Sequence, residues 1–299
     1  MYICGPDSNQ VGERMEFYHL RSFVVVAETG NLTKAAKQLF TTPPAVSAHI
    51  RALEDELKTT LFERTSKGMH LTPKGEQLRL QAQKTLDSAT DMVNLAVENA
   101  DQVIGTFRLG LNRDASTLRI AELVKALVHR CPGIELELHA LNTGQVLEKV
   151  SSGELDGGFV YGDTSPDLFH TELALQPITT IVPTSFDSTV IQSVYELAEL
   201  PWISVGEHCP FDTALKKRVT QSIKSQVQSA DNASRASLVE QGVGASFIEL
   251  EVAQAMVTAK QAQRLTLLDF EIPLSLVAKQ SALSNPVVKA VLEQLDALW

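Results

Sequence analysis

Residues 32–57 read LTKAAKQLFTTPPAVSAHIRALEDEL, and this stretch decides the fold of the N-terminal part of the chain. Its first half predicts a short helix whose alanines permit close packing of a neighbour. Its second half predicts a helix that begins after Thr42, because threonine is a good N-cap and Pro43 suits the first helical position. Together they predict a helix-turn-helix, in which one helix can enter the DNA major groove while the other braces it.

The flanking segments extend this pair of helices into a small winged domain. Residues 17–29 carry apolar side chains three and four positions apart, which predicts a helix that ends at Gly30. Residues 61–71 read as two short strands around a polar tip, which predicts a β-hairpin, or wing. We expect residues 1–14, which show no periodicity, to form a flexible tail, and residues 15–75 to form the DNA-binding domain.

The rest of the chain predicts a long helix followed by an α/β domain. Residues 76–104 form an amphipathic linker helix that ends at Gly105, and its apolar stripe is expected to pair with the same helix of a second copy. Residues 105–299 alternate between strand and helix patterns, with helices expected over 116–130 and about 210–225 and a strand over 178–182, which predicts a parallel sheet with crossover helices. The predicted fold class is therefore α/β, with a mainly helical winged domain at the N-terminus.

Composition excludes several classes of protein. No run of 18 apolar residues occurs, so we expect no membrane span. The N-terminus lacks the basic and apolar regions of a secretory signal, and three scattered cysteines do not form a disulfide framework, so a cytoplasmic location is expected. The chain has no HExxH, P-loop or GxSxG motif, and its histidines lack metal-ligand spacing. We therefore expect neither an enzyme nor a metal or cofactor site.

The net charge of −10 is unevenly distributed. Residues 15–75 carry a net charge of +2, whereas residues 76–299 carry −11. A mildly basic head on an acidic body fits a DNA reader joined to a separate sensor domain. It does not fit a nonspecific nucleic-acid coat protein, which needs a broad basic surface.

Between Phe17 and Gly75 the chain carries six sequence blocks: LRSF, AETGNLTKAA, PAVS, IRALE, LFER and LTPKG. Their order and spacing resemble the LysR-type family of transcriptional regulators. The rest of the chain matches that family more loosely, in length and pattern. The resemblance implies promoter DNA as a partner and a C-terminal effector domain that looks like a two-lobed periplasmic binding protein. Lobe one would comprise residues 105–175 and 271–299, and lobe two residues 176–270.

The resemblance also places particular residues at the DNA. Those on the wing would meet phosphate or the minor groove, and the others would lie at or near the major groove. They are Thr33, Thr42, Pro43, Pro44, Ser47, Ala48 and Arg51 at the groove, and Arg64 and Lys67 on the wing.

Two of these positions depart from the family pattern. Family members often have glutamine in place of Pro43 and a long polar residue in place of Ala48. Proline and alanine side chains cannot hydrogen-bond to base edges, although they can contact a thymine methyl group. We therefore expect fewer direct base contacts and more reliance on Ser47, Arg51 and DNA shape. His49 falls nearer the packed side of the same helix, so we expect it to have a structural role.

The effector is expected to bind between the lobes, at strand ends and helix N-termini, where free N–H groups favour an anion. Ser116, Thr143 and Asp212 are typical helix caps, and capping is compatible with ligand contact, so all three are kept as candidates. The identity of the effector cannot be predicted. The candidate residues are Arg113, Ser116, Thr117, Asn142, Thr143, His208, Cys209, Phe211 and Asp212.

An alternative is a thiol-based redox sensor. His208-Cys209 followed by Asp212 resembles the segment around the reactive cysteine in the family's peroxide-sensing branch, and a helix N-terminus with a neighbouring histidine would lower the thiol pKa. That branch has a resolving cysteine nine residues later, where this chain has Arg218. A small-molecule effector therefore remains the main prediction.

The resemblance also implies how copies assemble. Linker helices would dimerise so that two reading heads bind two half-sites of a pseudo-palindrome. Effector domains would pair further into a tetramer, and RNA polymerase would be a partner if the protein is an activator.

Overall fold

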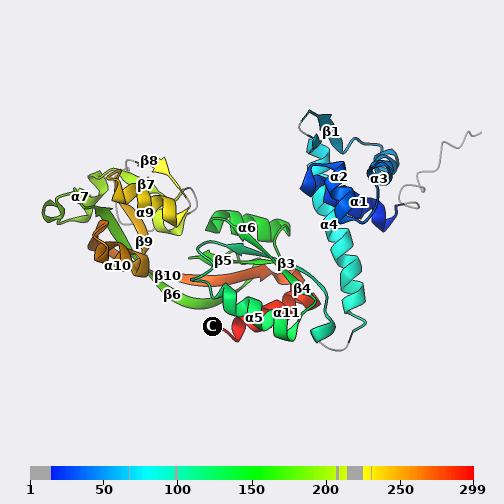
Figure 1. Cartoon of the computed structure of the whole chain (residues 1–299). Helices are drawn as coiled ribbons and strands as arrows, with labels where there is room; N and C mark the ends of the chain where they lie inside the picture. Colours follow the sequence, from blue (N-terminus) through cyan, green and yellow to red (C-terminus); the bar gives the residue numbers. More distant parts are fainter. Residues whose placement is uncertain (1–14, 67, 98–99, 207–208, 214–224, 230) are drawn as a thin grey trace, which may run out of the picture. The chain divides into compact units, whose positions relative to one another are not determined.

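The computed structural model describes residues 15–66, 68–97, 100–206, 209–213, 225–229 and 231–299. The chain divides into two compact units, Met1–Ala96 and Val97–Trp299 (Figure 1). Within the described ranges, no helix is both long and apolar enough to cross a membrane.

The first unit is a helical core with a two-stranded wing and a long final helix. β1 and β2 pair antiparallel, as the sequence predicts for the wing. Its elements are α1 (Phe17–Thr29), α2 (Leu32–Gln38), α3 (Pro43–Leu57), β1 (Phe62–Thr65), β2 (Gly68–Leu71) and α4 (Pro73–Asn94).

Side-chain caps fix where three of these helices begin. Asn31 caps α2 by accepting hydrogen bonds from the backbone N–H groups of Thr33 and Lys34. The hydroxyl of Thr42 caps α3, and that of Thr72 caps α4. Proline stands at the start of both α3 and α4, where its missing N–H costs nothing. The predicted start of α3 is thereby confirmed.

The core of the first unit joins α1, α2, α3 and the beginning of α4. Ala35 and Val46 are fully enclosed, so α2 and α3 approach closely, as the alanine-rich sequence predicts. Leu78, Ala82 and Leu86 of α4 pack against the same core. The first half of the predicted linker helix therefore does have a core to pack on within its own chain.

The linker helix is shorter than the predicted range of 76–104. α4 ends at Asn94, and a single 3-10 turn, η1 (Ala100–Gln102), precedes the first strand of the second unit. No glycine or proline marks this end, and residues 95–97 would suit a helix. The residues around Asn94 therefore carry no local signal for this helix end.

The second unit is built on a six-stranded sheet with the order β4-β3-β5-β10-β6-β9. β3 pairs parallel with β4 and β5, as predicted, whereas β10 runs antiparallel to β5 and β6. The bounds are β3 (Gly105–Leu111), α5 (Ile120–Arg130), β4 (Ile134–Ala140), α6 (Thr143–Ser152), β5 (Gly157–Tyr161), β6 (Leu168–Pro183), η2 (Ser188–Val190), α7 (Val194–Glu199), β7 (Trp202–Ser204), β8 (Ser225–Gln228), α9 (Asn232–Glu240), β9 (Ser246–Glu249), α10 (Leu250–Thr258), β10 (Ala262–Lys279), η3 (Gln280–Ala282) and α11 (Pro286–Asp296).

Two long strands join two lobes. We call the part built on β3, β4 and β5 lobe one, and the part built on β7, β8 and β9 lobe two. β6 and β10 pair with each other and extend from one lobe into the other (Figure 1). The predicted lobe boundaries, after residues 175 and 270, fall inside these two strands.

Helices cover both faces of the sheet in lobe one. Val160 of β5 packs with α6, whereas its neighbours Phe159 and Tyr161 belong to the core that α5 and α11 cover. Successive side chains of a strand point to opposite faces, so α6 lies on the face opposite α5 and α11. The carboxyl ends of β3, β4 and β5 therefore come together at one edge, beside the start of α6.

Some predicted elements need correction. α5 begins at Ile120 rather than near Ser116, after a series of turns. The helix predicted over residues 210–225 is present at 210–213 and lies mostly outside the described residues, but Ser225 begins strand β8. β10 was not predicted, and β6 was predicted only in part. Both strands contain an internal proline, which normally argues against a central strand.

Replacing Gly75 by alanine is expected to destabilise the first unit by about 1–3 kcal/mol. An added Cβ would lie 2.3 Å from the backbone oxygen of Leu61, and no side-chain rotation can relieve that contact. Urea unfolding followed by circular dichroism measures the change, with the exposed neighbour Lys74→Ala as control. Equal stability of the two variants would contradict this packing.

Candidate functional site

The outer surface of α2 and α3 presents most of the residues predicted at DNA. Thr33, Thr42, Pro44, Ala48 and Arg51 are exposed. The remaining two, Pro43 and Ser47, are half-buried at the start of α3. The helix-turn-helix thus leaves one polar and one cationic side chain, those of Ser47 and Arg51, one turn apart on a helix that can enter a groove.

The wing lies beside the start of α3. The Arg64 guanidinium on β1 donates a hydrogen bond to the Ser47 hydroxyl at 3.3 Å, which joins the wing to the candidate reading helix. A hydroxyl that accepts one hydrogen bond can still donate its own proton, so Ser47 remains able to contact DNA. Lys67, the second predicted wing residue, lies outside the described residues.

Two half-buried hydrogen bonds attach the reading helix α3 to the rest of its domain. The Glu54 carboxylate accepts from the backbone N–H of Leu61 at 2.7 Å and ties α3 to the base of the wing. The Ser22 hydroxyl lies 2.8 Å from the ring Nδ1 of His49, which links α1 to α3. Burial, together with the nearby His19, lowers the pKa of His49, so the ring stays neutral. The structural role predicted for His49 is consistent with this contact.

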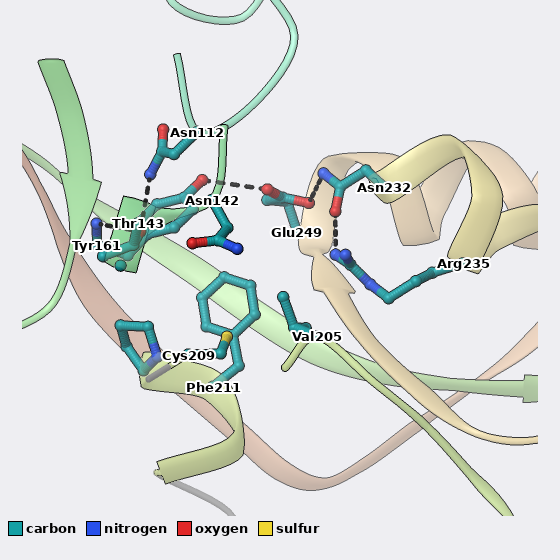
Figure 2. A pocket seen from close by; sticks show the side chains of 12 residues that line it. Asn112, Asn142, Thr143, Tyr161, Val205, Cys209, Phe211, Asn232, Arg235 and Glu249 are labelled. Carbon is teal, nitrogen blue, oxygen red and sulfur yellow. Dashed lines mark hydrogen bonds between the residues drawn. The ribbon is translucent and has the colours of Figure 1, made fainter. Parts of the chain in front are cut away.

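A cavity lies between the lobes of the second unit (Figure 2). Its empty space, counted together with open solvent at its mouth, is about 430 Å³, and about 30 Å³ of it can hold the centres of water-sized molecules. Lobe one contributes strand ends and the start of α6, and lobe two contributes α9, the end of β9 and the segment after β7. The lining residues are Asn112, Asn142, Thr143, Gly144, Tyr161, Val205, Cys209, Pro210, Phe211, Asn232, Arg235 and Glu249.

A second, more open cavity adjoins the first. It shares Asn112, Asn142 and Asn232 with the first, and about 190 Å³ of it can hold the centres of water-sized molecules. Arg113 and Asp114 line it from lobe one, where they follow β3. The shared residues make the two cavities parts of one cleft.

A chain of hydrogen bonds crosses the inner cavity from lobe one to lobe two (Figure 2). The Tyr161 hydroxyl donates to Glu249 Oε1 at 3.1 Å, and Asn232 Nδ2 donates to Glu249 Oε2 at 2.7 Å. Arg235 donates to the Asn232 side-chain oxygen and, at 3.0 Å, to the backbone carbonyl of Ser229. The chain therefore connects a strand end of lobe one to α9 of lobe two.

Burial governs the protonation of this chain. Burial, and next the negative charge of Glu249, raise the pKa of Tyr161 far above its ordinary value, so the phenol stays protonated and can donate. Burial lowers the pKa of Arg235, but neighbouring carboxylates, with Glu249 foremost, oppose this effect. Tyr161 is thus a neutral donor to a carboxylate that is only 1% exposed.

The lobe-one wall is built around Thr143. Its hydroxyl accepts hydrogen bonds from the Asn112 amide at 3.4 Å and from the Tyr161 backbone N–H at 3.1 Å. Asn142, rather than Thr143, is the N-cap of α6, in a reciprocal pair with Gln145. The side-chain oxygen of Asn112 is buried with no hydrogen-bond partner, so it can accept a bond from a bound molecule.

The structure brings together part of the predicted effector site. The predicted residues that line the cleft are Arg113, Asn142, Thr143, Cys209 and Phe211.

The other predicted effector residues lie elsewhere. Ser116 is exposed and Thr117 bonds to the Asp114 carbonyl; neither lines the two cavities, because α5 begins later than predicted. Asp212 accepts a hydrogen bond from the Gly206 N–H instead of lining the cavity. His208 lies outside the described residues.

Sequence reasoning missed the polar chain Tyr161, Glu249, Asn232 and Arg235. Tyr161 and Glu249 each end a buried strand, and ligand sites of α/β sheets lie at strand ends. That signal was available in the runs GGFVY and SFIE. Arg235 offered no signal, because an arginine on a short polar helix is usually exposed.

Cys209 differs from the expected reactive thiol. Burial raises its pKa to about 11, and hydrogen bonds from the following backbone N–H groups only partly oppose this. The expected lowering by the helix start is therefore outweighed by desolvation. The described residues also contain no group of three or more side chains suited to hold a metal ion.

Comparison with known proteins identifies the family. Residues 17–76 match the model described as bacterial regulatory helix-turn-helix protein, lysR family, and residues 100–299 match the LysR substrate binding domain. The chain belongs to the LysR family. It is a LysR-type DNA-binding transcriptional regulator with an effector-binding domain.

Similar proteins are named as regulators rather than enzymes. The uncharacterized HTH-type transcriptional regulator YusT of Bacillus subtilis is 30% identical over 203 residues, which cover 68% of this chain and 67% of YusT. The regulator YofA of the same organism is 32% identical over 148 residues, 50% of this chain and 52% of YofA. The matched segment therefore spans about half the length of YofA.

Solved structures share the fold of this LysR-family chain. A full-length OxyR variant from Pseudomonas aeruginosa has a TM-score of 0.65 and 20% identity, covering 96% of this chain and 95% of OxyR. Full-length CbnR in complex with its target DNA has a TM-score of 0.62 and 21% identity, covering 95% of this chain and 99% of CbnR. At such identities the likeness supports the winged head and the α/β effector domain as a fold.

Alkylation of Cys209 by iodoacetamide at neutral pH is expected to be slow. The test uses a variant that carries Cys4→Ser and Cys131→Ser and so retains Cys209 alone. Only the thiolate reacts, and the raised pKa lowers its population by about two orders of magnitude relative to an ordinary thiol. Mass spectrometry measures the rate, with the same variant unfolded in urea as control. Equal rates in the two states would contradict this environment.

Proposed function

We propose that the chain binds promoter DNA through α2, α3 and the wing, and that a small molecule in the cleft of the second unit switches DNA binding or activation. The observation that carries the proposal is the capped, braced α3, which leaves Ser47 and Arg51 facing outward beside the wing. The similar protein CbnR, whose full-length structure is a complex with its target DNA, supports the same use of the head.

The proposed DNA contacts divide into two kinds. Arg51 can hydrogen-bond to a base edge in the major groove, and Ser47 can add a second polar contact. Pro44 and Ala48 are exposed but have no side-chain donors or acceptors, so they provide apolar contact. We therefore propose that base readout is sparse and that DNA shape supplies part of the specificity. The full set is Thr33, Thr42, Pro43, Pro44, Ser47, Ala48 and Arg51 on the helices, and Arg64 and Lys67 on the wing.

The proposed effector site is the cleft between the lobes. Its inner cavity combines an apolar side, from Phe211 and Val205, with polar groups that converge from both lobes, as small-molecule sites do. A ligand can switch the protein only if it binds one arrangement of the lobes more tightly than another. The Tyr161–Glu249 hydrogen bond joins the lobes across this site, so a ligand there would alter their arrangement.

We further propose that α4 is the dimer contact. Beyond the part of α4 that packs on its own head, Met92, Val93 and Leu95 expose apolar side chains. Pairing of two α4 helices on the side that carries Met92 would cover these side chains and present two heads to two half-sites. Pairing of effector domains into a tetramer, and contact with RNA polymerase if the protein activates, extend the same scheme.

The Arg51→Ala variant is expected to bind its operator about ten- to a hundredfold more weakly, because a base contact by arginine contributes about 1–3 kcal/mol. A band-shift titration against the promoter DNA upstream of its own gene measures this. Arg79→Ala, which removes the same charge from α4, is the control. Unchanged affinity of Arg51→Ala would remove Arg51 from the reading surface.

The Met92→Glu variant is expected to shift the assembly toward monomer, because dimerisation would bury a carboxylate in an apolar seam. Sedimentation velocity at micromolar concentration measures the change, and Met92→Leu, which keeps an apolar side chain at the same position, is the control. Wild-type protein that is monomeric under these conditions would contradict the dimer itself.

A further inference from the structure

Glu249 is a buried carboxylate on the cavity wall whose hydrogen-bond partners are both neutral. One oxygen accepts from the Tyr161 hydroxyl and the other from the Asn232 amide. Among the described residues, no lysine, arginine or histidine forms a salt bridge with it. A carboxylate has about four acceptor positions, so Glu249 can accept further donors from the cavity.

The carboxylate is also not used to cap its own helix. Glu249 occupies the N-cap position of α10, where an acidic side chain commonly accepts from the first backbone N–H groups. Here the side chain makes no such bond and lies instead in the cavity wall, between Tyr161 and Asn232 (Figure 2). Its charge therefore acts on the cavity.

The cations of the cleft are directed to other partners. Arg235 donates to Asn232 and to the Ser229 carbonyl, and Arg113 donates to the Gln176 side-chain oxygen at 2.7 Å. Both arginines act on the Tyr161–Glu249 pair through their charge, because Glu249 is the foremost carboxylate raising the pKa of Arg235 and Arg113 lowers that of Tyr161. A ligand cation that donates directly to Glu249 would further lower the cost of burying its charge.

The charges that line the cleft also favour a cation. Among the described residues, the two cavities are lined by Arg113 and Arg235, against Asp114, Asp231 and Glu249. A simple anion at the start of α6 would have to enter beside a buried carboxylate. The helix N-terminus alone, on which the sequence-based expectation of an anion rested, therefore does not decide the ligand charge.

We propose that Glu249 is the counter-ion for a protonated amine, so that the effector is a small primary ammonium compound whose apolar part rests on Phe211 and Val205. The inference rests on the proposed function of the cleft as the effector site. The ammonium group would donate to the open acceptor positions of Glu249 on the cavity wall. By competing with the Tyr161 hydroxyl for Glu249, it would weaken the direct bond between the lobes.

The test measures binding of probes that share a carbon skeleton and differ in charge. n-Butylamine and phenethylamine are compared with butyrate and phenylacetate in ligand-observed NMR titrations of the full-length protein. The amines are expected to bind at least tenfold more tightly than the acids. Tighter binding of the acids, or no binding of either amine, would overturn the proposal.

Variants locate the charge contact. Glu249→Gln keeps the shape and an acceptor oxygen but removes the charge, and it is expected to weaken amine binding at least tenfold. Glu251→Gln, on the exposed first turn of α10, is the matched control and is expected to bind amines like the wild type. Equal amine affinity of Glu249→Gln and the wild type would overturn the assignment.

A second variant separates ligand contact from a merely structural role. Tyr161→Phe removes the neutral donor that competes for Glu249, so amine affinity is expected to stay equal or to increase. If Tyr161→Phe loses affinity as far as Glu249→Gln does, the pair only holds the cavity wall in shape and the proposal fails.

Operator titrations distinguish a wrong ammonium assignment from a wrong proposed function of the cleft. If the acids bind and change operator affinity, the cleft is still an effector site and only the ammonium assignment is wrong. If an amine binds through Glu249 without changing operator affinity or transcription, the ligand class stands and the proposed switching is wrong.

Discussion

The antiparallel pairing of β6 with β10 is the constraint on which the cleft depends. These strands carry the chain into lobe two and back, so their pairing sets how the ends of β5 and β9 face each other. Where β6 pairs with β9 in lobe two, residues 266–269 of β10 bulge opposite the single residue Thr179. The Thr179 hydroxyl donates to Asp269 at 2.5 Å and accepts from Arg264 at 3.0 Å, which fixes this irregularity. Two paired strands, rather than a loop, thus connect the lobes.

The cleft illustrates how burial changes the chemistry that local motifs suggest. A cysteine at a helix start is expected to have a lowered pKa, yet desolvation raises that of Cys209. A helix N-terminus suggests an anion, yet the buried carboxylate of Glu249 lies in the same cavity as the start of α6. In both cases the local effect of a helix dipole competes with desolvation of the charged group. Desolvation depends on residues that are far away in the sequence.

The reading head was predictable because its determinants are local. Thr42 and Pro43 mark the start of α3, Gly30 ends α1, and the alanines of α2 permit close packing. The family blocks add spacing that few other domains share. The end of α4 at Asn94 was not predictable, because the residues after it would suit a helix and no breaker follows. The hydrogen bond between Arg64 and Ser47 was also not predictable from the sequence, because it joins residues from separate elements.

The sequence by itself determined the winged head, the α/β class of the second unit and membership of the LysR family. Caps, periodicity and spaced motifs are local features, so they can be recognised without the tertiary structure. It also placed Arg113, Asn142, Thr143, Cys209 and Phe211 near the cleft between the lobes. Only the tertiary structure decided that Tyr161 meets Glu249, because 88 residues separate them and the paired long strands bring them together. The charge that a ligand would meet in the cleft arises from that encounter and from the burial that accompanies it.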